Sequence, residues 1–389
     1  MGRIQGNIDD MKAETSLCAS FAYSASQRLK VLTPIPLRRR ERRGDAEKTV
    51  ELFRLTLLAL LIFSSFSVAQ SQTAPTRIYR GAIGDKHIEM RLNISGAQVD
   101  GTYLYDQFKQ DIKLEGTYDS KGELSLSEGA GKKKTGKFVC KAEPEAPDTD
   151  LECEWSRVDG TGKRMVYLVE QWIQFKSGTE LIPKVILDQK TKAFASIPQL
   201  KAPLMTDAMN GFNRLIESQL QAAIKAFQPE SVANSSFDTN YNVLLCNDEI
   251  VSVEMVEYLD VGGAHPNSRF WTVSYNLKTN KPLSLNDVFR EGDEYNTVIA
   301  GFVAKDINRR AEQMDRQEAR RNNRQPEKRD EPVMSADQLP EMDTWGVSAK
   351  GFVVYFDFPH VMAVFDKTIV PWGLLTRYLR ADGVVPLVK

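Results

Sequence analysis

Residues 250–277, IVSVEMVEYLDVGGAHPNSRFWTVSYNL, contain two strand-like runs separated by a glycine-rich turn. Apolar and polar residues alternate in these runs with the two-residue period of a half-buried strand. The two glycines permit backbone geometry that other residues rarely adopt, and Pro266 fixes the chain just after His265. We therefore predict an antiparallel pair of strands, Ile250–Tyr258 and Phe270–Leu277, joined by a rigid loop.

Helical patterns flank this pair on both sides. Apolar residues of the segment 208–227 fall on one helical face, and Pro229 ends that helix. A second helix is expected over about 295–324, and a last sheet element at Gly351–Phe358. The region 176–389 is therefore predicted to be an α+β domain with helices packed on an antiparallel sheet.

The region 75–172 has a different texture, with short alternating runs separated by turn residues. About eight such runs at regular spacing are typical of an antiparallel β-meander closed into a small barrel. We predict this barrel as a separate N-terminal domain. Its aromatic residues are expected to pack in the core or the wall: Tyr103, Tyr105, Tyr118, Trp155 and Tyr167.

The cysteines predict one disulfide. Cys140 and Cys153 flank an acidic, proline-containing loop, where two neighbouring strands would place them opposite each other. Such a bond would contribute about 3 kcal/mol in the chain-entropy model. Cys246 lies in an apolar run and is expected to be a buried free thiol. No cysteine pair has ligand spacing and the chain has three histidines, so we expect no metal and no cofactor.

The segment 55–69 predicts export. A basic flank, a short apolar run and small residues at its end are typical of a secretory signal peptide. The apolar run is shorter than the roughly 20 residues of a membrane span. Residues 1–69 are therefore interpreted as a polar lead and signal peptide of an exported protein, periplasmic or extracellular. The formal net charge of −1 provides no field that would attract nucleic acid.

The glycine and histidine motif is the candidate binding site: Gly262, Gly263, Ala264, His265, Pro266 and Asn267. Catalysis by His265 would need a substrate or water within hydrogen-bond reach and a carboxylate such as Asp260 or Asp357. No nucleophile elbow, zinc-binding histidine pair or phosphate-binding loop accompanies the motif. We interpret His265 as a loop-holding residue and predict no catalytic residue. A cell-wall hydrolase or deacetylase that uses His265 stays the alternative.

The strings at 262–267, 275–279 and 283–289 together resemble the exported domain at the C-terminus of the RsiV anti-sigma factor. That domain also accompanies some peptidoglycan deacetylases. The helix at 208–227 resembles the segment that precedes it, so the resemblance covers about 190–389. It implies an α+β module without catalysis of its own that, in RsiV, recognises lysozyme.

The chain departs from that pattern at Phe358–Phe365, where the family has an aromatic and acidic stretch. From the resemblance we expect an exported, non-enzymatic binding protein of the cell envelope, with a lysozyme-like protein or peptidoglycan as partner. No nucleic-acid partner is expected, and contact with the membrane is expected only through an uncleaved signal segment. A membrane-anchored anti-sigma signalling protein is a further alternative.

Overall fold

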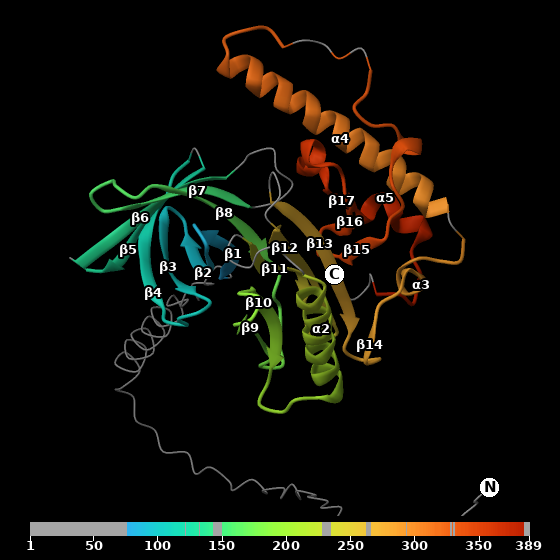
Figure 1. Cartoon of the computed structure of the whole chain (residues 1–389), viewed down its shortest axis with the longest axis horizontal. Coiled ribbons are helices and arrows are strands. Elements are labelled where there is room, and N and C mark those ends of the chain that lie inside the picture. The colour runs from blue at the N-terminus through green and yellow to red at the C-terminus, as the bar shows by residue number, and fades with distance from the viewer. Residues whose placement is uncertain are drawn as a thin grey trace, which may run out of the picture. The chain divides into compact units, whose positions relative to one another are not determined.

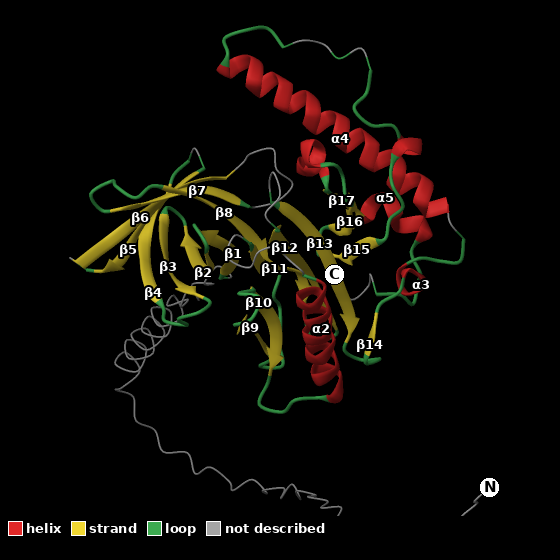
Figure 2. Cartoon of the chain, viewed as in Figure 1, coloured by secondary structure: helices red, strands yellow, loops and turns green. Residues whose placement is uncertain are grey.

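The computed structural model describes residues 76–120, 122–131, 133–142, 150–227, 235–261, 266–292, 294–326, 329 and 331–384. Residues 1–75, which include the predicted signal peptide, lie outside these ranges, as do Gly262, Gly263, Ala264 and His265. Strands are the commonest regular element of the described chain, and its helices follow residue 206 (Figure 2). No helix among the described residues is long and apolar enough to cross a membrane.

The N-terminal region is a closed antiparallel barrel whose strands are paired in chain order (Figure 1). The first and last strands close it, with Tyr79 opposite Glu170. This confirms the predicted meander and its closure. The strands are β1 (Arg77–Ile83), β2 (Lys86–Ser95), β3 (Gln98–Tyr105), β4 (Ile112–Tyr118), β5 (Glu123–Ala130), β6 (Lys133–Ala142), β7 (Leu151–Arg157) and β8 (Arg164–Gln171).

Side chains that point inward fill the barrel. Tyr103 lies in this core, and Tyr105, Tyr118 and Trp155 pack against it, as predicted. The prediction was wrong for Tyr167, which is 65% exposed. Successive residues of a strand point to opposite faces, and β8 turns Val166 and Leu168 inward, so Tyr167 faces outward.

The predicted disulfide joins two neighbouring strands of the barrel. Cys140 of β6 lies directly opposite Cys153 of β7, and the two form a disulfide within the core. Cys246 is a buried free thiol, as predicted, and burial raises its pKa well above the usual value. The sequence therefore located the bond correctly from the spacing of the two strands.

Reduction of the Cys140–Cys153 bond should lower the free energy of unfolding by about 3 kcal/mol, because the unfolded chain gains the freedom of the opened loop. Denaturant unfolding with and without reductant measures this difference. The Cys246→Ala variant serves as control and should respond to reductant as the parent does. An unchanged unfolding midpoint after verified reduction would contradict the expectation.

A six-stranded sheet follows the barrel, in the order β14-β13-β12-β11-β10-β9. β12 and β13 pair antiparallel along their length, with Val253 opposite Val273, which confirms the predicted pair. β9 and β10 were not predicted. The strands are β9 (Glu180–Leu187), β10 (Phe194–Lys201), β11 (Ser236–Cys246), β12 (Ile250–Asp260), β13 (Asn267–Asn276) and β14 (Lys281–Pro282).

Helix α2 (Asp207–Ala226) lies between β10 and β11 in the chain and packs on the sheet. Thr206 caps its N-terminus by accepting a hydrogen bond from the Met209 backbone. Its apolar face buries Phe212, Ile216 and Leu220 among residues of the sheet. The helix therefore matches the predicted segment 208–227 and covers one face of the sheet (Figure 1).

A three-stranded sheet and the remaining helices form the last part of the fold, around a core of their own. Its first strand contacts β12 and β13, where Val347 N donates to the hydroxyls of Ser252 and Ser274 at 3.2 and 3.3 Å. The elements are α3 (Leu285–Val288), α4 (Glu294–Arg321), η2 (Ala336–Gln338), β15 (Thr344–Val347), β16 (Gly351–Tyr355), η3 (His360–Phe365), β17 (Lys367–Pro371), α5 (Trp372–Leu375) and η4 (Thr376–Tyr378). The predicted element at Gly351–Phe358 corresponds to β16, but it is not the last strand, because β17 follows.

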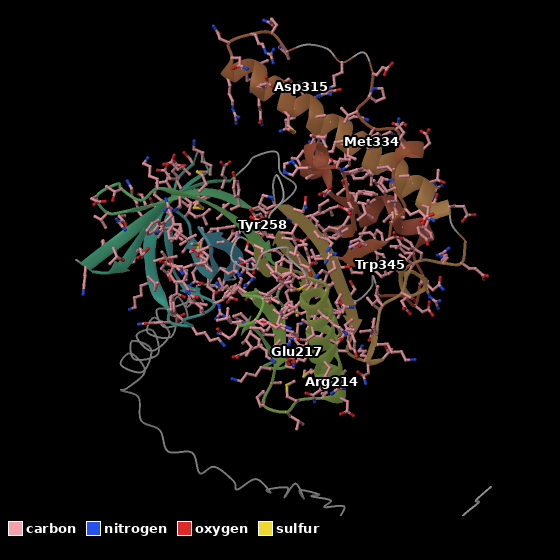
Figure 3. The ribbon with its side chains drawn as sticks, viewed as in Figure 1. Arg214, Glu217, Tyr258, Asp315, Met334 and Trp345 are labelled. Atoms are coloured by element: carbon pink, nitrogen blue, oxygen red, sulfur yellow. A yellow bond between two sulfur atoms is a disulfide. The ribbon has the colours of Figure 1, made fainter. Side chains whose placement is uncertain are left out.

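The segment after α4 returns along the helix. Arg329 forms a two-hydrogen-bond ion pair with Asp315, at 2.6 and 2.9 Å. Asn308 donates to Met334 O at 2.7 Å and accepts from Val333 N at 2.6 Å. Figure 3 labels Asp315 on α4 and Met334 on the returning segment. These contacts attach the segment that leads into η2 to the side of α4.

Arg80 connects the barrel to the six-stranded sheet. This β1 residue is 1% exposed, and its Nε donates to the Tyr241 carbonyl of β11 at 3.1 Å. Its Nη2 donates to Asn240 Oδ1 at 3.0 Å, and its guanidinium lies 3.8 Å from the centre of the Tyr241 ring. The charge is balanced by an ion pair with Asp106 and a longer one with Glu89, at 3.5 Å.

Asp106 completes this connection from the end of β3. It accepts hydrogen bonds from Arg80 and from the Ser196 hydroxyl of β10. Although burial opposes ionisation, the guanidinium of Arg80 holds the pKa of Asp106 below its usual value. The chain between barrel and sheet is also paired, since Trp172 N donates to Val243 O and Gln174 N donates to Cys246 O. Residues 72–389 accordingly form one compact unit, and the boundary between 172 and 176 stays a prediction.

Replacing Arg80 should strongly destabilise the protein. Arg80→Met leaves Asp106 buried without its cation, which typically costs about 3–5 kcal/mol, while Glu89 keeps its ion pair with Arg91. Arg77→Met is the matched control on the same strand, because Arg77 is 45% exposed and pairs with Glu170 only at 3.8 Å. That change should cost at most about 1 kcal/mol. Equal unfolding free energies for the two variants would contradict the assigned role of Arg80.

Candidate functional site

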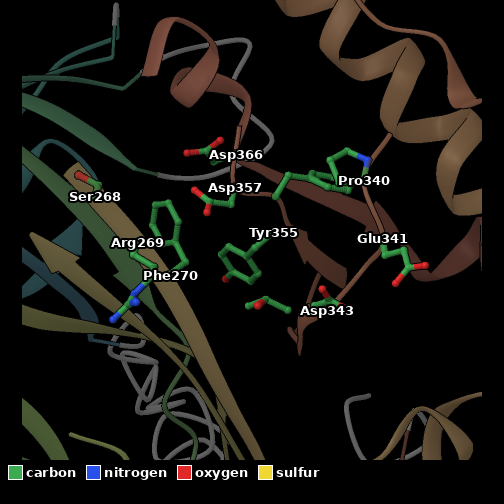
Figure 4. Close-up of a pocket in the computed structure, with 11 residues that line it drawn as sticks. Ser268, Arg269, Phe270, Pro340, Glu341, Asp343, Tyr355, Asp357 and Asp366 are labelled. Atoms are coloured by element: carbon green, nitrogen blue, oxygen red, sulfur yellow. The ribbon is translucent and has the colours of Figure 1, made fainter. Parts of the chain in front are cut away.

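A cavity of about 260 Å³ opens between β13, the end of β16 and the segment that leads into β15. Figure 4 shows its side chains converging from these separate parts of the chain. We call it the acidic cleft, because four of its lining residues are carboxylates. Its lining residues are Ser268, Arg269, Phe270, Pro340, Glu341, Asp343, Thr344, Tyr355, Phe356, Asp357 and Asp366.

Two carboxylates of the acidic cleft lie at the ends of the loop that contains η3. Asp357 follows β16 and is exposed, whereas Asp366 precedes β17 and is 6% exposed. Asp366 closes the loop, since its Oδ1 accepts from Phe358 N at 3.1 Å and its carbonyl accepts from Phe356 N at 2.7 Å. The loop closure therefore fixes both carboxylates at the cavity.

Burial raises the pKa of Asp366, and the neighbouring charge of Asp357 raises it further, while the hydrogen bond from Phe358 N opposes the shift. A negative charge on Asp366 is therefore disfavoured in the folded protein. A cation bound in the acidic cleft would relieve this unfavourable electrostatic environment.

The arginine of the acidic cleft does not neutralise these carboxylates. Arg269 donates to Glu257 Oε2 at 2.7 and 3.1 Å, and Trp271 Nε1 donates to the other oxygen of Glu257 at 2.6 Å. In Figure 4 the guanidinium of Arg269 points away from the carboxylates. Because neighbouring residues of β13 point to opposite faces, Phe270 faces the cleft where Arg269 turns away. The cation is thus held by a buried carboxylate outside the cavity.

Three carboxylates of the acidic cleft have no compensating group among the described residues. Glu341, Asp343 and Asp357 are exposed and form no hydrogen bond or ion pair with another described residue. Tyr355 in the cavity wall donates to the buried Glu254 instead. The cavity therefore presents uncompensated negative charge to a ligand.

A paired buried charge supports the wall behind the acidic cleft. Glu254 of β12 accepts from Tyr355 and from Asn242 Nδ2, and it pairs with Lys367 at 2.7 Å. Although burial opposes ionisation, Lys367 holds the pKa of Glu254 below its usual value. These bonds fix Tyr355 between the two sheets and hold its ring at the cavity.

A second cavity of about 420 Å³ adjoins the first and shares Pro340, Glu341, Asp343 and Phe356 with it. We call it the apolar groove, because most of its other lining side chains are apolar. Those other residues are Leu285, Asn296, Ile299, Ala300, Ala336, Leu339 and Met342. The segment 340–343 is thus the common wall of a charged and an apolar cavity.

The described flank of the glycine and histidine motif leads directly to the acidic cleft. Asn267 opens β13 opposite Leu259, and the next residues of β13 line the cavity. Gly262 to His265 lie outside the described residues, so the loop-holding role of His265 stays a prediction. Of its two proposed carboxylate partners, Asp260 ends β12 and Asp357 lines the acidic cleft.

Glu341, Asp343 and Asp366 were not predicted as site residues. They come from irregular segments, where no periodic pattern indicates which side chains face inward. The available signal was the acidic composition of the stretch around 341–343. No group of three or more histidine, cysteine, aspartate or glutamate side chains in the described ranges is arranged to hold a metal ion.

No family model matches the sequence, and neither does any curated protein. Two solved structures are similar in part. A DUF3298 family protein from Pseudomonas aeruginosa PAO1 has 18% identity and a TM-score of 0.33, over 52% of this chain and 94% of that one. A member of the DUF3298 family from Bacteroides fragilis NCTC 9343 has 10% identity and a TM-score of 0.34, over 54% and 96%. Both scores are low, so neither likeness identifies a family or a function for this chain.

Replacing Asp366 should stabilise the protein at neutral pH. Because the folded state raises the pKa of Asp366, its ionised form destabilises the fold above that pKa, and this cost disappears as the pH falls through it. Asp366→Asn removes the charge and keeps an oxygen that accepts from Phe358 N. We expect its melting temperature to exceed that of the parent at pH 7, with the difference vanishing near pH 3. A lower melting temperature at pH 7 would show that the charge itself is needed for the fold.

Proposed function

We propose that this chain is an exported, non-enzymatic binding protein that captures a cationic partner in the acidic cleft, and that this partner is a lysozyme-like protein. The observation that carries the proposal is the uncompensated charge of Glu341, Asp343 and Asp357 in one cavity. The arginine beside them already pairs with Glu257 outside the cavity. A basic partner would therefore gain attraction without first breaking an ion pair.

Two observations support export. The pattern of residues 55–69 is that of a signal peptide, and the Cys140–Cys153 disulfide is compatible with an oxidising compartment. The lysozyme-like partner comes from the resemblance of 190–389 to the RsiV domain. The negative cleft agrees with it, because clefts of one sign concentrate partners of the opposite charge and accelerate their association.

The cleft also supports a second candidate, a cell-wall hydrolase. Asp357 and Asp366 line one cavity, and burial raises the pKa of Asp366. Hydrolysis of glycosides uses a pair of carboxyl groups, of which the general acid has a raised pKa. The bond from Phe358 N to Asp366 favours a loop-closing role instead. Binding without hydrolysis is therefore the function that the geometry supports better.

Titration of the protein with a lysozyme of basic isoelectric point tests the proposal. Asp343→Asn combined with Asp357→Asn should weaken binding roughly threefold to tenfold at low salt, because two attractive charges are lost. Glu291→Gln is the matched control, since Glu291 is exposed and lies outside the lining of the cleft. Lysozyme with acetylated lysines keeps its arginines but has a lower positive charge, so its binding to the parent should be weaker than that of unmodified lysozyme.

Salt-independent binding, or equal affinity of the double variant and the control, would contradict capture by the acidic cleft. Incubation with purified peptidoglycan separates the second candidate. A binding protein leaves the muropeptide profile unchanged, whereas release of new muropeptides that stops in Asp357→Asn would establish a hydrolase.

A further inference from the structure

We infer that the acidic cleft and the apolar groove form one bipartite site, which takes an arginine and a neighbouring bulky apolar side chain from a single exposed segment of the partner protein. This inference rests on the proposed function and specifies what the partner must present. It is carried by the juxtaposition of the two cavities across one short segment of chain.

The two cavities share a wall. Pro340, Glu341, Asp343 and Phe356 line both, so a ligand group in one cavity lies next to a group in the other. Glu341 and Asp343 are exposed, whereas Phe356 is buried between the cavities. Two adjacent side chains of an extended segment could therefore enter the two cavities on either side of the wall.

The apolar groove is lined by side chains from several parts of the fold. Leu285 comes from α3, Ile299 and Ala300 come from α4, and Leu339 and Met342 come from the segment between η2 and β15. Its volume of about 420 Å³ falls within the roughly 300–1,000 Å³ typical of sites that enclose a compact organic group. A large aliphatic or aromatic side chain would bury apolar area there.

The acidic cleft favours a guanidinium over an ammonium group. Its wall contains the rings of Phe270 and Tyr355, whose centres are 5.5 Å apart. The Tyr355 ring is buried, whereas the Phe270 ring is partly exposed. A planar guanidinium can stack on the Phe270 ring and still donate to carboxylates at its edge, here Asp343 or Asp357. The same negative charge repels an anionic lipid headgroup, so the observations favour a basic segment of protein over a membrane surface.

Three blocked hexapeptides that differ at two central positions test the inference. The first carries Arg beside Trp, the second Arg beside Ser, and the third Gln beside Trp. Fluorescence anisotropy of labelled peptides measures each affinity for the full mature chain. We expect the first peptide to bind roughly tenfold more tightly than either of the others, because it alone fills both cavities.

Two sets of variants assign the two halves of the site. Ala300→Trp fills the apolar groove and should abolish the preference for Trp over Ser while keeping the preference for Arg over Gln. Asp343→Asn combined with Asp357→Asn should abolish the preference for Arg over Gln while keeping the preference for Trp over Ser. Thr297→Trp is the matched control, because Thr297 is exposed on the same helix and does not line the groove. If Ala300→Trp unfolds by circular dichroism, Ala336→Trp replaces it, since Ala336 is an exposed residue of the same lining.

Equal binding of the first two peptides, or an Ala300→Trp variant that keeps the preference for Trp, would overturn the bipartite site. The expected peptide pattern together with no binding of lysozyme would refute the lysozyme proposal and leave the bipartite site standing. Binding of lysozyme without the expected peptide pattern would refute the bipartite site and leave the lysozyme proposal standing.

Discussion

The buried ion pair between Arg80 and Asp106 is the contact on which the arrangement of the chain depends. A guanidinium stays protonated inside a protein, so burying it is tolerable only where enough acceptors converge on it. The barrel supplies Asp106 and Glu89, and the sheet supplies Asn240 and the Tyr241 carbonyl. Neither half alone provides the full set, so the burial of Arg80 requires the barrel and the sheet to lie together. β11 pairs with β12 and β12 pairs with β13, whose first residues line the acidic cleft.

The acidic cleft has the properties of a site that was not optimised for stability. Its carboxylates repel one another, and the fold raises the pKa of Asp366 where it lowers those of Asp106 and Glu254. Asp106 and Glu254 are therefore matched with cations, whereas no described cation pairs with the carboxylates of the cleft. Such a local loss of folding stability is common at sites that bind a ligand.

The sequence predicted elements whose pattern is local and failed where contacts are long-range. The helix at 208–227, the β12–β13 pair, the barrel and the Cys140–Cys153 bond all follow from periodicity or strand spacing. β9 and β10 were missed because each contains a proline within a short run, which obscures a strand pattern. The acidic cleft was missed for a further reason, since its carboxylates come from separate irregular segments and only the folded sheet brings them together.

The alternation of β13 has a consequence for the sign of the cleft. Phe270 faces the cavity and Arg269 the opposite side only in the observed register, with Arg269 opposite Glu257 and Phe270 opposite Val256. A slip of β13 by one residue that brings Phe270 opposite Glu257 would exchange the faces of the two side chains. The arginine would then enter the cavity and cancel part of its charge, while an aromatic ring would replace it over Glu257. The length of the connection 261–266 thus fixes the register of β13, and through that register it determines the net charge of the acidic cleft.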